Sequence, residues 1–414
     1  MSQLMTDAIT RLTPDHGPSA PSPEALARGL HAIREHLGME VAFISEFTAG
    51  RRVFRQVDAA RTPCVVEAGG SDPLEESFCQ RVVDGRLPEL MQDACQNAEA
   101  LSLPVTQALP VGAHLSVPLR LSDGRVYGTL CCFSHQPDLT LTQRDLATLR
   151  VFSDLVSQQI ERDMVLQEQQ AATRARLDGA LQPGRMRSVY QPIVDLVARR
   201  VVGVEALTRF DCEPQRPPDQ WFHDAGEARR GSELELHAIR LALRGLDDLP
   251  RPLYLSLNAS PQTVLDPRLT QLLASQPLDR LVLELTEHEE VAHYSEIARV
   301  VNPLRRAGLR VAVDDAGAGF ASFRHILNLA PDLIKLDLSI TQHIDADRSR
   351  QALAIALRHF ADATQGRLVA EGVETEPELS KLLQLGITLA QGYSLGRPGT
   401  LAQALTAPAG PRLH

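Results

Sequence analysis

The sequence predicts an α/β fold: a closed (β/α)8 barrel with one antiparallel strand, preceded by a smaller α+β domain and a helical linker. From residue 187 onward, apolar runs typical of strands alternate with longer helical patterns, which favours a parallel sheet covered by helices. Seven or eight such runs over about 225 residues suit a closed barrel better than an open sheet. The first two runs look like a hairpin, so one barrel strand is expected to be antiparallel. The runs are residues 189–196, 201–210, 253–260, 281–287, 309–317, 332–340, 367–374 and 389–396.

Composition limits the class of protein. The chain has 414 residues, 43% of them hydrophobic and 23% charged, which is an ordinary globular balance with room for two or three domains. The net charge is −10 and no run of Lys and Arg occurs, so a polymeric nucleic acid is disfavoured, while a small phosphorylated ligand is not. Without a secretory signal, a CxxC pair or an apolar stretch of about 18 residues, the chain is expected to be cytoplasmic and not in a membrane.

The N-terminal part predicts a sensor-sized domain over residues 23–165. Residues 1–22 are rich in Pro, Ser and Thr and predict a poorly ordered tail. A helix over 23–38 and strands over 39–47 and 51–60 follow. Two later runs, 113–121 and 126–134, flank an Asp-Gly signal and predict a β-hairpin. A helix over 141–166 closes the domain.

The closing helix leads into a polar, helix-prone segment, residues 166–180, which predicts a helical linker. An apolar stripe at helical spacing consists of Leu149, Phe152, Val156, Ile160 and Met164. This stripe suits either a dimerising coiled-coil seam or the packed face of an amphipathic helix, and both interpretations remain open.

Polar residues end the apolar runs of the barrel. They are Glu205, Asn258, Glu284, Asp314, Asp315, Lys335, Glu371 and Gln391. In a (β/α)8 barrel the carboxyl ends of the strands form the active-site face, so these side chains are expected to converge there.

The chemistry of this cluster indicates a metal site. Several carboxylates cannot all stay ionised at close range without a cation. Oxygen ligands without His or Cys favour Mg²⁺ or Mn²⁺, with Ca²⁺ as a further option. Two metals held by adjacent aspartates suit in-line attack at phosphorus, and a lysine can orient the attacking water or stabilise developing negative charge.

Eight short motifs occur in order: YQPIVDL, EALTRF, LNAS, ELTE, VDDAGAG, PDLIKLD, AEGVET and QGYSLGRP. With these motifs, residues 181–407 resemble the EAL domain, a family of cyclic di-GMP phosphodiesterases built on a modified triosephosphate-isomerase (TIM-like) barrel. The resemblance implies metal-dependent hydrolysis of cyclic di-GMP to linear 5′-pGpG, with two Mg²⁺ or Mn²⁺ ions. A cyclic-di-GMP receptor with weak or no catalysis is the alternative.

The resemblance also implies residue roles. The metal ligands would be Glu205, Asn258, Glu284 and Asp314 for one ion, and Asp314, Asp315 and Glu371 for the second ion and a bridging water. The catalytic residues would be Lys335, which would hold the attacking water, with Glu205 and Glu371. The substrate would contact Gln191, Leu207, Arg209 and Gln391, and Glu287 would support a neighbouring loop.

One loop departs from the family pattern. Where the family commonly reads DDFGTGYSS, this chain reads DDAGAGFAS, so Ala316, Ala318 and Ala321 replace Phe, Thr and Ser. Gly317 and Gly319 remain and keep a tight turn available. The change puts loop packing, and its coupling to a dimer interface, in doubt, while activity is still expected.

The N-terminal domain, over residues 23–161, resembles a GAF sensor module through LGMEVAFISEF, PVGAHLSVPL and DGRVYGTLCCFS. The resemblance implies a small ligand of unknown identity, a homodimer, and regulation of the barrel. Cys79 is a candidate for chromophore attachment, although a packed thiol is the favoured interpretation. Cys131 and Cys132 are expected on opposite faces of a strand, where buried thiols are the favoured interpretation and redox or cofactor chemistry is the alternative.

Overall fold

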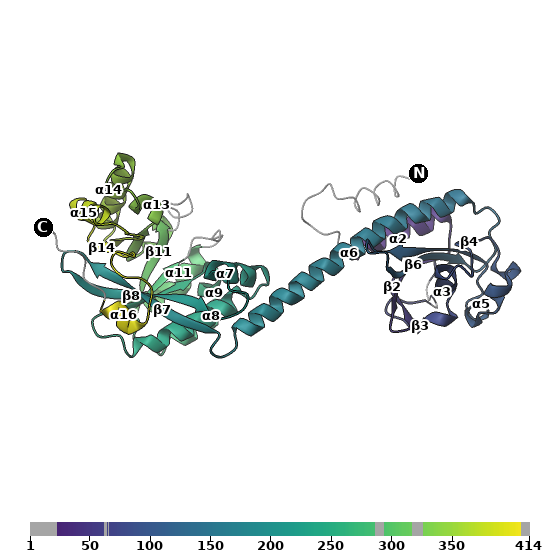
Figure 1. Ribbon diagram of the computed structural model, residues 1–414, viewed down its shortest axis with the longest axis horizontal. Helices are drawn as coiled ribbons and strands as arrows, with labels where there is room; N and C mark the ends of the chain where they lie inside the picture. The colour runs from purple at the N-terminus through teal and green to yellow at the C-terminus, as the bar shows by residue number, and fades with distance from the viewer. Residues whose placement is uncertain (1–22, 62–63, 65, 286–293, 317–325, 407–414) are drawn as a thin grey trace. The chain divides into compact units, whose positions relative to one another are not determined.

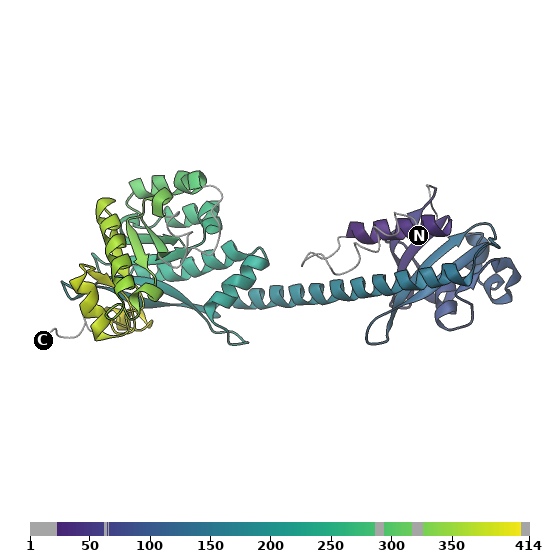
Figure 2. The same cartoon turned by 90° about the horizontal axis from the view of Figure 1, so that it is seen from above.

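The computed structural model describes residues 23–61, 64, 66–285, 294–316 and 326–406; at residues 23–25 and at Asp315 it describes the backbone alone. The chain divides into two compact units, Met1–Gln169 and Gln170–His414 (Figures 1 and 2). Helix α6 (Gln143–Ala180) contributes residues to both units as one continuous helix. Among the described helices, none combines the length and the apolar character needed to cross a membrane.

The N-terminal unit is built on a six-stranded antiparallel sheet with strand order β3-β2-β1-β6-β5-β4. The strands are β1 (Val41–Thr48), β2 (Arg51–Ala59), β3 (Ser71–Pro73), β4 (Leu90–Met91), β5 (Ala113–Arg120) and β6 (Val126–Ser134). The helices besides α6 are α2 (Pro23–Leu37), α3 (Phe78–Val83), α4 (Ala98–Leu101) and α5 (Pro104–Ala108). The predicted first helix, first two strands and hairpin are therefore confirmed.

The sheet buries a separate core on each face, because successive strand residues point to opposite sides. Cys132 packs on one face with residues of α2 and α6, while Cys131 packs on the other face with residues of α3. The expected opposite placement of the two thiols is confirmed.

The stripe on α6 belongs to the first of these cores. Its members Leu149, Phe152, Val156 and Ile160 are buried against the sheet of their own chain, so the packed-face interpretation is correct for them. Met164 lies beyond the sheet and is 40% exposed. The four buried residues have no apolar surface left for a coiled-coil partner.

The C-terminal unit is a closed barrel with strand order β10-β11-β12-β13-β14-β7-β8-β9. Strand β7 runs antiparallel to both of its neighbours, and the other pairs are parallel, which confirms the predicted barrel with one antiparallel strand. The strands are β7 (Met186–Asp195), β8 (Arg200–Phe210), β9 (Tyr254–Ala259), β10 (Leu281–Leu285), β11 (Arg310–Ala316), β12 (Leu333–Leu336), β13 (Arg367–Ala370) and β14 (Leu389–Ala390).

Helices surround these strands on the outside of the barrel (Figure 1). They are α7 (Pro218–Glu227), α8 (Gly231–Leu243), α9 (Pro261–Leu265), α10 (Pro267–Leu273), α11 (Tyr294–Arg306), α13 (Leu338–Thr341), α14 (Arg348–Ala363), α15 (Glu376–Gln384) and α16 (Leu401–Leu405). One predicted run, 332–340, is only half strand. The Asp337 side chain accepts a hydrogen bond from the Ser339 backbone N–H and caps α13, so the strand ends at Leu336.

The barrel interior is layered. One closed apolar layer, formed where strand residues point inward, consists of Ile193, Tyr254, Val282, Ala312, Leu333, Val369 and Leu389. Two residues further along each parallel strand, the next inward position carries a polar group, as in Val282 and Glu284 or Leu333 and Lys335. On the antiparallel strand β7 the direction is reversed, so Gln191 precedes Ile193. A polar layer therefore lies directly on an apolar floor.

Candidate active site

Lys335 lies at the centre of the polar layer and is 2% exposed. Its Nζ lies 2.6 Å from Glu371 Oε1 and 2.8 Å from Glu284 Oε2. The same nitrogen lies 3.2 Å from Asp314 Oδ1 and 3.3 Å from Glu205 Oε2. Four carboxylates from β8, β10, β11 and the end of β13 therefore surround one buried ammonium group.

Amide side chains hold Glu205 from the other side. Asn258 Nδ2 donates to Glu205 Oε1 at 2.9 Å, and Gln391 Nε2 donates to Glu205 Oε2 at 2.6 Å. Gln391 Nε2 also lies 2.9 Å from Gln191 Oε1, while Gln191 Nε2 donates to the Gly396 carbonyl at 3.1 Å. Gln391 Oε1 is buried without a hydrogen-bond partner in the described part of the chain. An acceptor is thus left over for a donor from outside the described residues.

Ser256 is a member of the cluster that the sequence analysis missed. Its hydroxyl is fully buried and donates to Glu284 Oε1. The signal was available, because Ser256 precedes Asn258 by two residues on β9 and therefore shares its inward face. Strand β9 thus contributes an inward-facing polar residue to each of two successive layers, Ser256 to one and Asn258 to the next.

The pKa values of the central pair reflect this crowding. Burial would raise the pKa of Glu205, but the charge of Lys335 and the hydrogen bonds from Asn258 and Gln391 outweigh burial and hold that pKa below its ordinary value. Burial alone would lower the pKa of Lys335. The surrounding carboxylates reverse this and raise it well above the ordinary lysine value. Lys335 is therefore permanently protonated.

Two of the carboxyls are perturbed in the opposite direction. Burial, opposed by Lys335 and reinforced by the negative charges of Glu205 and Asp314, raises the pKa of Glu284 to about 8. Burial likewise raises the pKa of Glu371 well above its ordinary value, against the effect of Lys335. One lysine is too little positive charge for four carboxylates that crowd around it, of which Glu205 and Glu284 are buried and Asp314 and Glu371 are partly buried.

This charge deficit bears on whether the site fits a metal ion. Among the described side chains, no group of three His, Cys, Asp or Glu residues is arranged to hold a metal ion. The four carboxylates of the cluster point toward Lys335 instead. The donors are nevertheless all oxygens, they converge at one end of the barrel, and they lack compensating charge. Such a set fits a hard divalent cation.

A cavity of about 520 Å³ adjoins the cluster. Asn258 lines it, as do Leu207 and Arg209 of β8, and helices α7 and α8 supply apolar walls that include Phe222 and Ile239. The Arg209 guanidinium is held by a 2.8 Å hydrogen bond from Nη1 to the Thr208 carbonyl. The volume suits a small ligand, and the lining combines the basic Arg209 and His223 with the acidic Asp219, Glu227 and Glu235.

The structure brings together Glu205, Asn258, Glu284, Asp314, Lys335, Glu371, Gln191 and Gln391, and it places Leu207 and Arg209 at the adjoining cavity. Asp315 lies in β11, but its side chain is outside the described residues. Glu287 and the loop residues Gly317, Ala318, Gly319 and Ala321 are also outside them. Ala316, at the end of β11, is fully buried.

Comparisons with known proteins agree with this geometry. The EAL domain family matches residues 174–398, more than half of the chain, and the GAF domain matches residues 19–161. An uncharacterised signalling protein of Caulobacter vibrioides is 27% identical over 365 residues, which cover 85% of this chain and 44% of the relative. The cyclic di-GMP phosphodiesterase PdeF of Escherichia coli is 28% identical over 242 residues, 56% of this chain and 32% of the relative. The chain spans less than half the length of either relative.

Among solved structures, the PaMucR phosphodiesterase in complex with c-di-GMP is 25% identical, with a TM-score of 0.51, over 56% of this chain and 100% of that chain. The matched family, the closed barrel and the polar layer at its mouth agree. The chain therefore belongs to the EAL domain family and carries a GAF domain ahead of its EAL barrel.

Proposed function

We propose that the barrel is a metal-dependent phosphodiesterase that opens cyclic di-GMP to linear 5′-pGpG. One observation carries this proposal: four carboxylates surround a buried lysine at the mouth of an EAL barrel, an amide side chain holds one of them, and the positive charge among these groups is too small. A phosphodiesterase relative and a solved phosphodiesterase bound to c-di-GMP support the choice of substrate.

Glu205, Asn258, Glu284 and Asp314 would hold one Mg²⁺ or Mn²⁺, and Asp314, Asp315 and Glu371 a second. A bound divalent cation would supply charge neutralisation at the phosphate and would lower the pKa of water. Lys335, which stays protonated, donates to the attacking water and fixes its position. The water oxygen bonds to phosphorus and gives up a proton to a carboxylate of the cluster, while the bond from phosphorus to the 3′ oxygen breaks and that oxygen takes up a proton. The product pGpG therefore has a terminal 5′ phosphate and a free 3′ hydroxyl.

The adjoining cavity supports the substrate half of the proposal. Arg209 would pair with a phosphate oxygen, because a guanidinium matches the geometry of an anionic oxygen pair. Leu207 would contact the ligand through its apolar side chain. Gln191 and Gln391 would complete the contacts, and the unpaired Gln391 Oε1 would accept a hydrogen bond.

The GAF domain would regulate the barrel through α6 in response to a small ligand whose identity remains open. A homodimer is part of the same proposal. It is supported by apolar residues of α6 that stay exposed, among them Met164, the last member of the stripe, and its neighbours Val165 and Leu166. Sedimentation analysis of the full chain tests it, and a monomer at all concentrations would contradict it.

The activity is tested by incubating the full chain with cyclic di-GMP and Mn²⁺ or Mg²⁺, with a chelator as control, while pGpG formation is followed. We expect turnover with either metal and none with the chelator. Binding is measured in parallel by calorimetry. Tight binding without turnover in both metals would replace the enzyme with the alternative, a cyclic-di-GMP receptor.

A further inference from the structure

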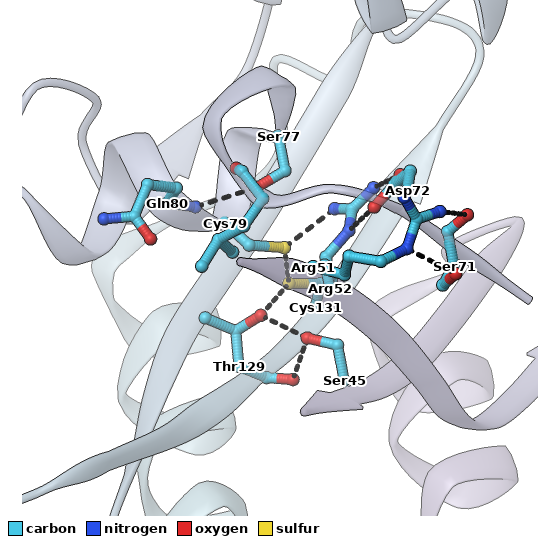
Figure 3. A network of polar contacts seen from close by, with 11 residues as sticks. Ser45, Arg51, Arg52, Ser71, Asp72, Ser77, Cys79, Gln80, Thr129 and Cys131 are labelled. Atoms are coloured by element: carbon cyan, nitrogen blue, oxygen red, sulfur yellow. Dashed lines mark hydrogen bonds and ion pairs between the residues drawn. The ribbon is translucent and has the colours of Figure 1, made fainter. Parts of the chain in front are cut away.

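The N-terminal unit contains a buried pair of thiols that the barrel chemistry does not use. Cys79 of α3 and Cys131 of β6 are both fully buried, and their Sγ atoms lie 3.2 Å apart (Figure 3). The two residues are 52 positions apart in the chain. Their contact is therefore a product of the fold and not of local sequence.

A buried cation lies against one member of the pair. Arg52 is 4% exposed, and its Nη1 donates to Cys79 Sγ at 3.0 Å (Figure 3). Its Nε donates to Asp72 Oδ1 at 3.0 Å, and its guanidinium lies over the rings of Phe43 and Phe54 at 5.4 and 4.8 Å. Arg52 is thus held in place by groups other than the thiol. Its Nη2 also donates to Asp72, and Nη1 is the group that faces the thiol and favours an anion at Cys79.

The two thiols are made chemically unequal. Burial would raise the pKa of Cys79, but the hydrogen bond with Cys131 and the charge of Arg52 lower it to about 6. Burial and the contact with Cys79 raise the pKa of Cys131 well above its ordinary value. Cys131 also lies 2.9 Å from the Ser116 hydroxyl and 3.1 Å from that of Thr129. Because Arg52 contacts Cys79 and not Cys131, it favours the thiolate at Cys79, with Cys131 beside it as the neutral thiol.

We propose that Cys79 and Cys131 form a reversible intrachain disulfide when the protein meets hydrogen peroxide. The Cys79 thiolate attacks one peroxide oxygen, so an S–O bond forms and the O–O bond breaks. Hydroxide leaves and takes up the proton that Cys79 lost on ionising. The Cys131 sulfur then attacks Cys79, the S–S bond forms, and the sulfenic hydroxyl leaves with the Cys131 proton as water. Two thiols and one peroxide thereby give one disulfide and two waters.

The geometry favours this pair over the other thiols of the chain. Closing from 3.2 Å to the disulfide length of about 2.05 Å requires a shift of about 1 Å, within reach of side-chain rotation. Cys132 adjoins Cys131 in sequence but points into the opposite core. Cys95 is exposed and shows no contact with another thiol in the described part of the chain.

To assign the disulfide to two cysteines, each tryptic peptide of the test protein must contain a single cysteine. Trypsin would leave Cys64 and Cys79 together in residues 62–81, and Cys131 and Cys132 together in residues 126–144. The test protein is therefore the full chain with Cys64→Ser and Cys132→Ser, alongside the unchanged chain mapped by fragmentation. Each is treated with hydrogen peroxide or with dithiothreitol, alkylated under denaturing conditions and digested.

We expect the two peptides to be joined after peroxide and separate after dithiothreitol. A further Cys79→Ser or Cys131→Ser change should abolish the link, whereas Cys95→Ser should leave it. Arg52→Met should slow the loss of the Cys79 thiol several-fold. The proposal is overturned if Cys79 and Cys131 both remain alkylatable after peroxide exposure that oxidises Cys95, or if Cys79 links to another cysteine in the unchanged chain.

Discussion

At the scale of single residues, the choice of lysine at position 335 has a physical reason. The chain has 42 Lys and Arg residues, and only Lys335 and Lys381 are lysines. A compact ammonium group can donate to several carboxylates around a point, whereas a planar guanidinium presents a rigid fork. Four carboxylate oxygens within 3.3 Å of one nitrogen suit the first geometry and not the second.

Replacing Lys335 with Met should abolish pGpG formation. The change leaves two buried and two partly buried acids without their cation, so without added metal we expect a loss of stability of about 3–5 kcal/mol. Thermal unfolding and the cleavage assay measure the two effects separately. Lys381→Met is the matched control, because Lys381 lies on α15, where its Nζ donates a hydrogen bond to Gln384 Oε1. Wild-type turnover in Lys335→Met would contradict its assigned role.

His114 gives the GAF domain a pH dependence. It is buried on β5, its Nδ1 has no partner among the described residues, and burial together with the charge of Arg52 lowers its pKa to about 3. In the unfolded chain this histidine has the ordinary pKa of about 6.5 and takes up a proton as the pH falls through that value, whereas in the folded chain it stays neutral there. The free energy of unfolding therefore decreases as pH falls below about 6.5.

We expect this histidine to cost about 2 kcal/mol of stability between about pH 7 and about pH 5. Urea unfolding of the full chain at both pH values, compared with His114→Asn, measures the difference. The variant should lose less stability on acidification than the parent chain. His223→Gln is the control, because His223 is exposed on α7. An equal pH response in the parent and in His114→Asn would rule out this source.

At the scale of elements, strand alternation brings the residues of the candidate active site together. On most parallel strands, an inward-facing apolar residue is followed two positions later by an inward-facing polar residue. The polar side chains therefore form one layer directly above the apolar layer. The last of these groups, Gln391, depends on a tight backbone contact. A Cβ at Gly392 would lie 2.2 Å from both N and O of Val373, between the hydrogen bonds that join the two segments.

Gly392→Ala should therefore displace Gln391 and weaken the closure of the barrel. We expect a loss of about 1–3 kcal/mol in stability and a large loss of cleavage activity. Gly179→Ala is the matched control. Nothing lies within 4 Å of a Cβ at Gly179, which sits in α6, so that variant should gain about 1 kcal/mol in helix stability. Full activity in Gly392→Ala would show that Gln391 does not need this contact.

At the scale of the whole molecule, α6 is the one described element that contributes to the cores of both units. Leu149 and Phe152 pack in the N-terminal core, and Leu177 and Ala180 pack in the C-terminal one. The intervening turns are mostly exposed. If the GAF domain regulates the barrel, the continuity of this helix is the physical route between them.

A proline in the exposed part of α6 tests that route. Gln169→Pro removes a helix hydrogen bond and costs about 3 kcal/mol locally, without touching either core. We expect the cleavage rate to shift to that of a chain lacking residues 1–169, while Gln169→Ala keeps the parent rate. Identical rates in all four proteins would argue against regulation through the helix.

Much of this protein is determined by local sequence. The alternation of strands and helices specifies the barrel, the hairpin of residues 189–210 specifies the antiparallel strand, and the polar residue at each strand end specifies the site. These features are readable because strand and helix periods are properties of the local chain. Ser256 was missed because one inward-facing polar residue was expected on each strand, whereas β9 carries two, Ser256 and Asn258.

Other features were decided by tertiary structure alone. Whether Leu149 to Ile160 faced a second chain or its own sheet depended on which surface lay nearby, and periodicity is the same in both cases. The contact between Cys79 and Cys131, with Arg52 beside it, joins residues from three distant elements. No local pattern encodes such a contact, because it arises only when the sheet and the helix above it bury their side chains together.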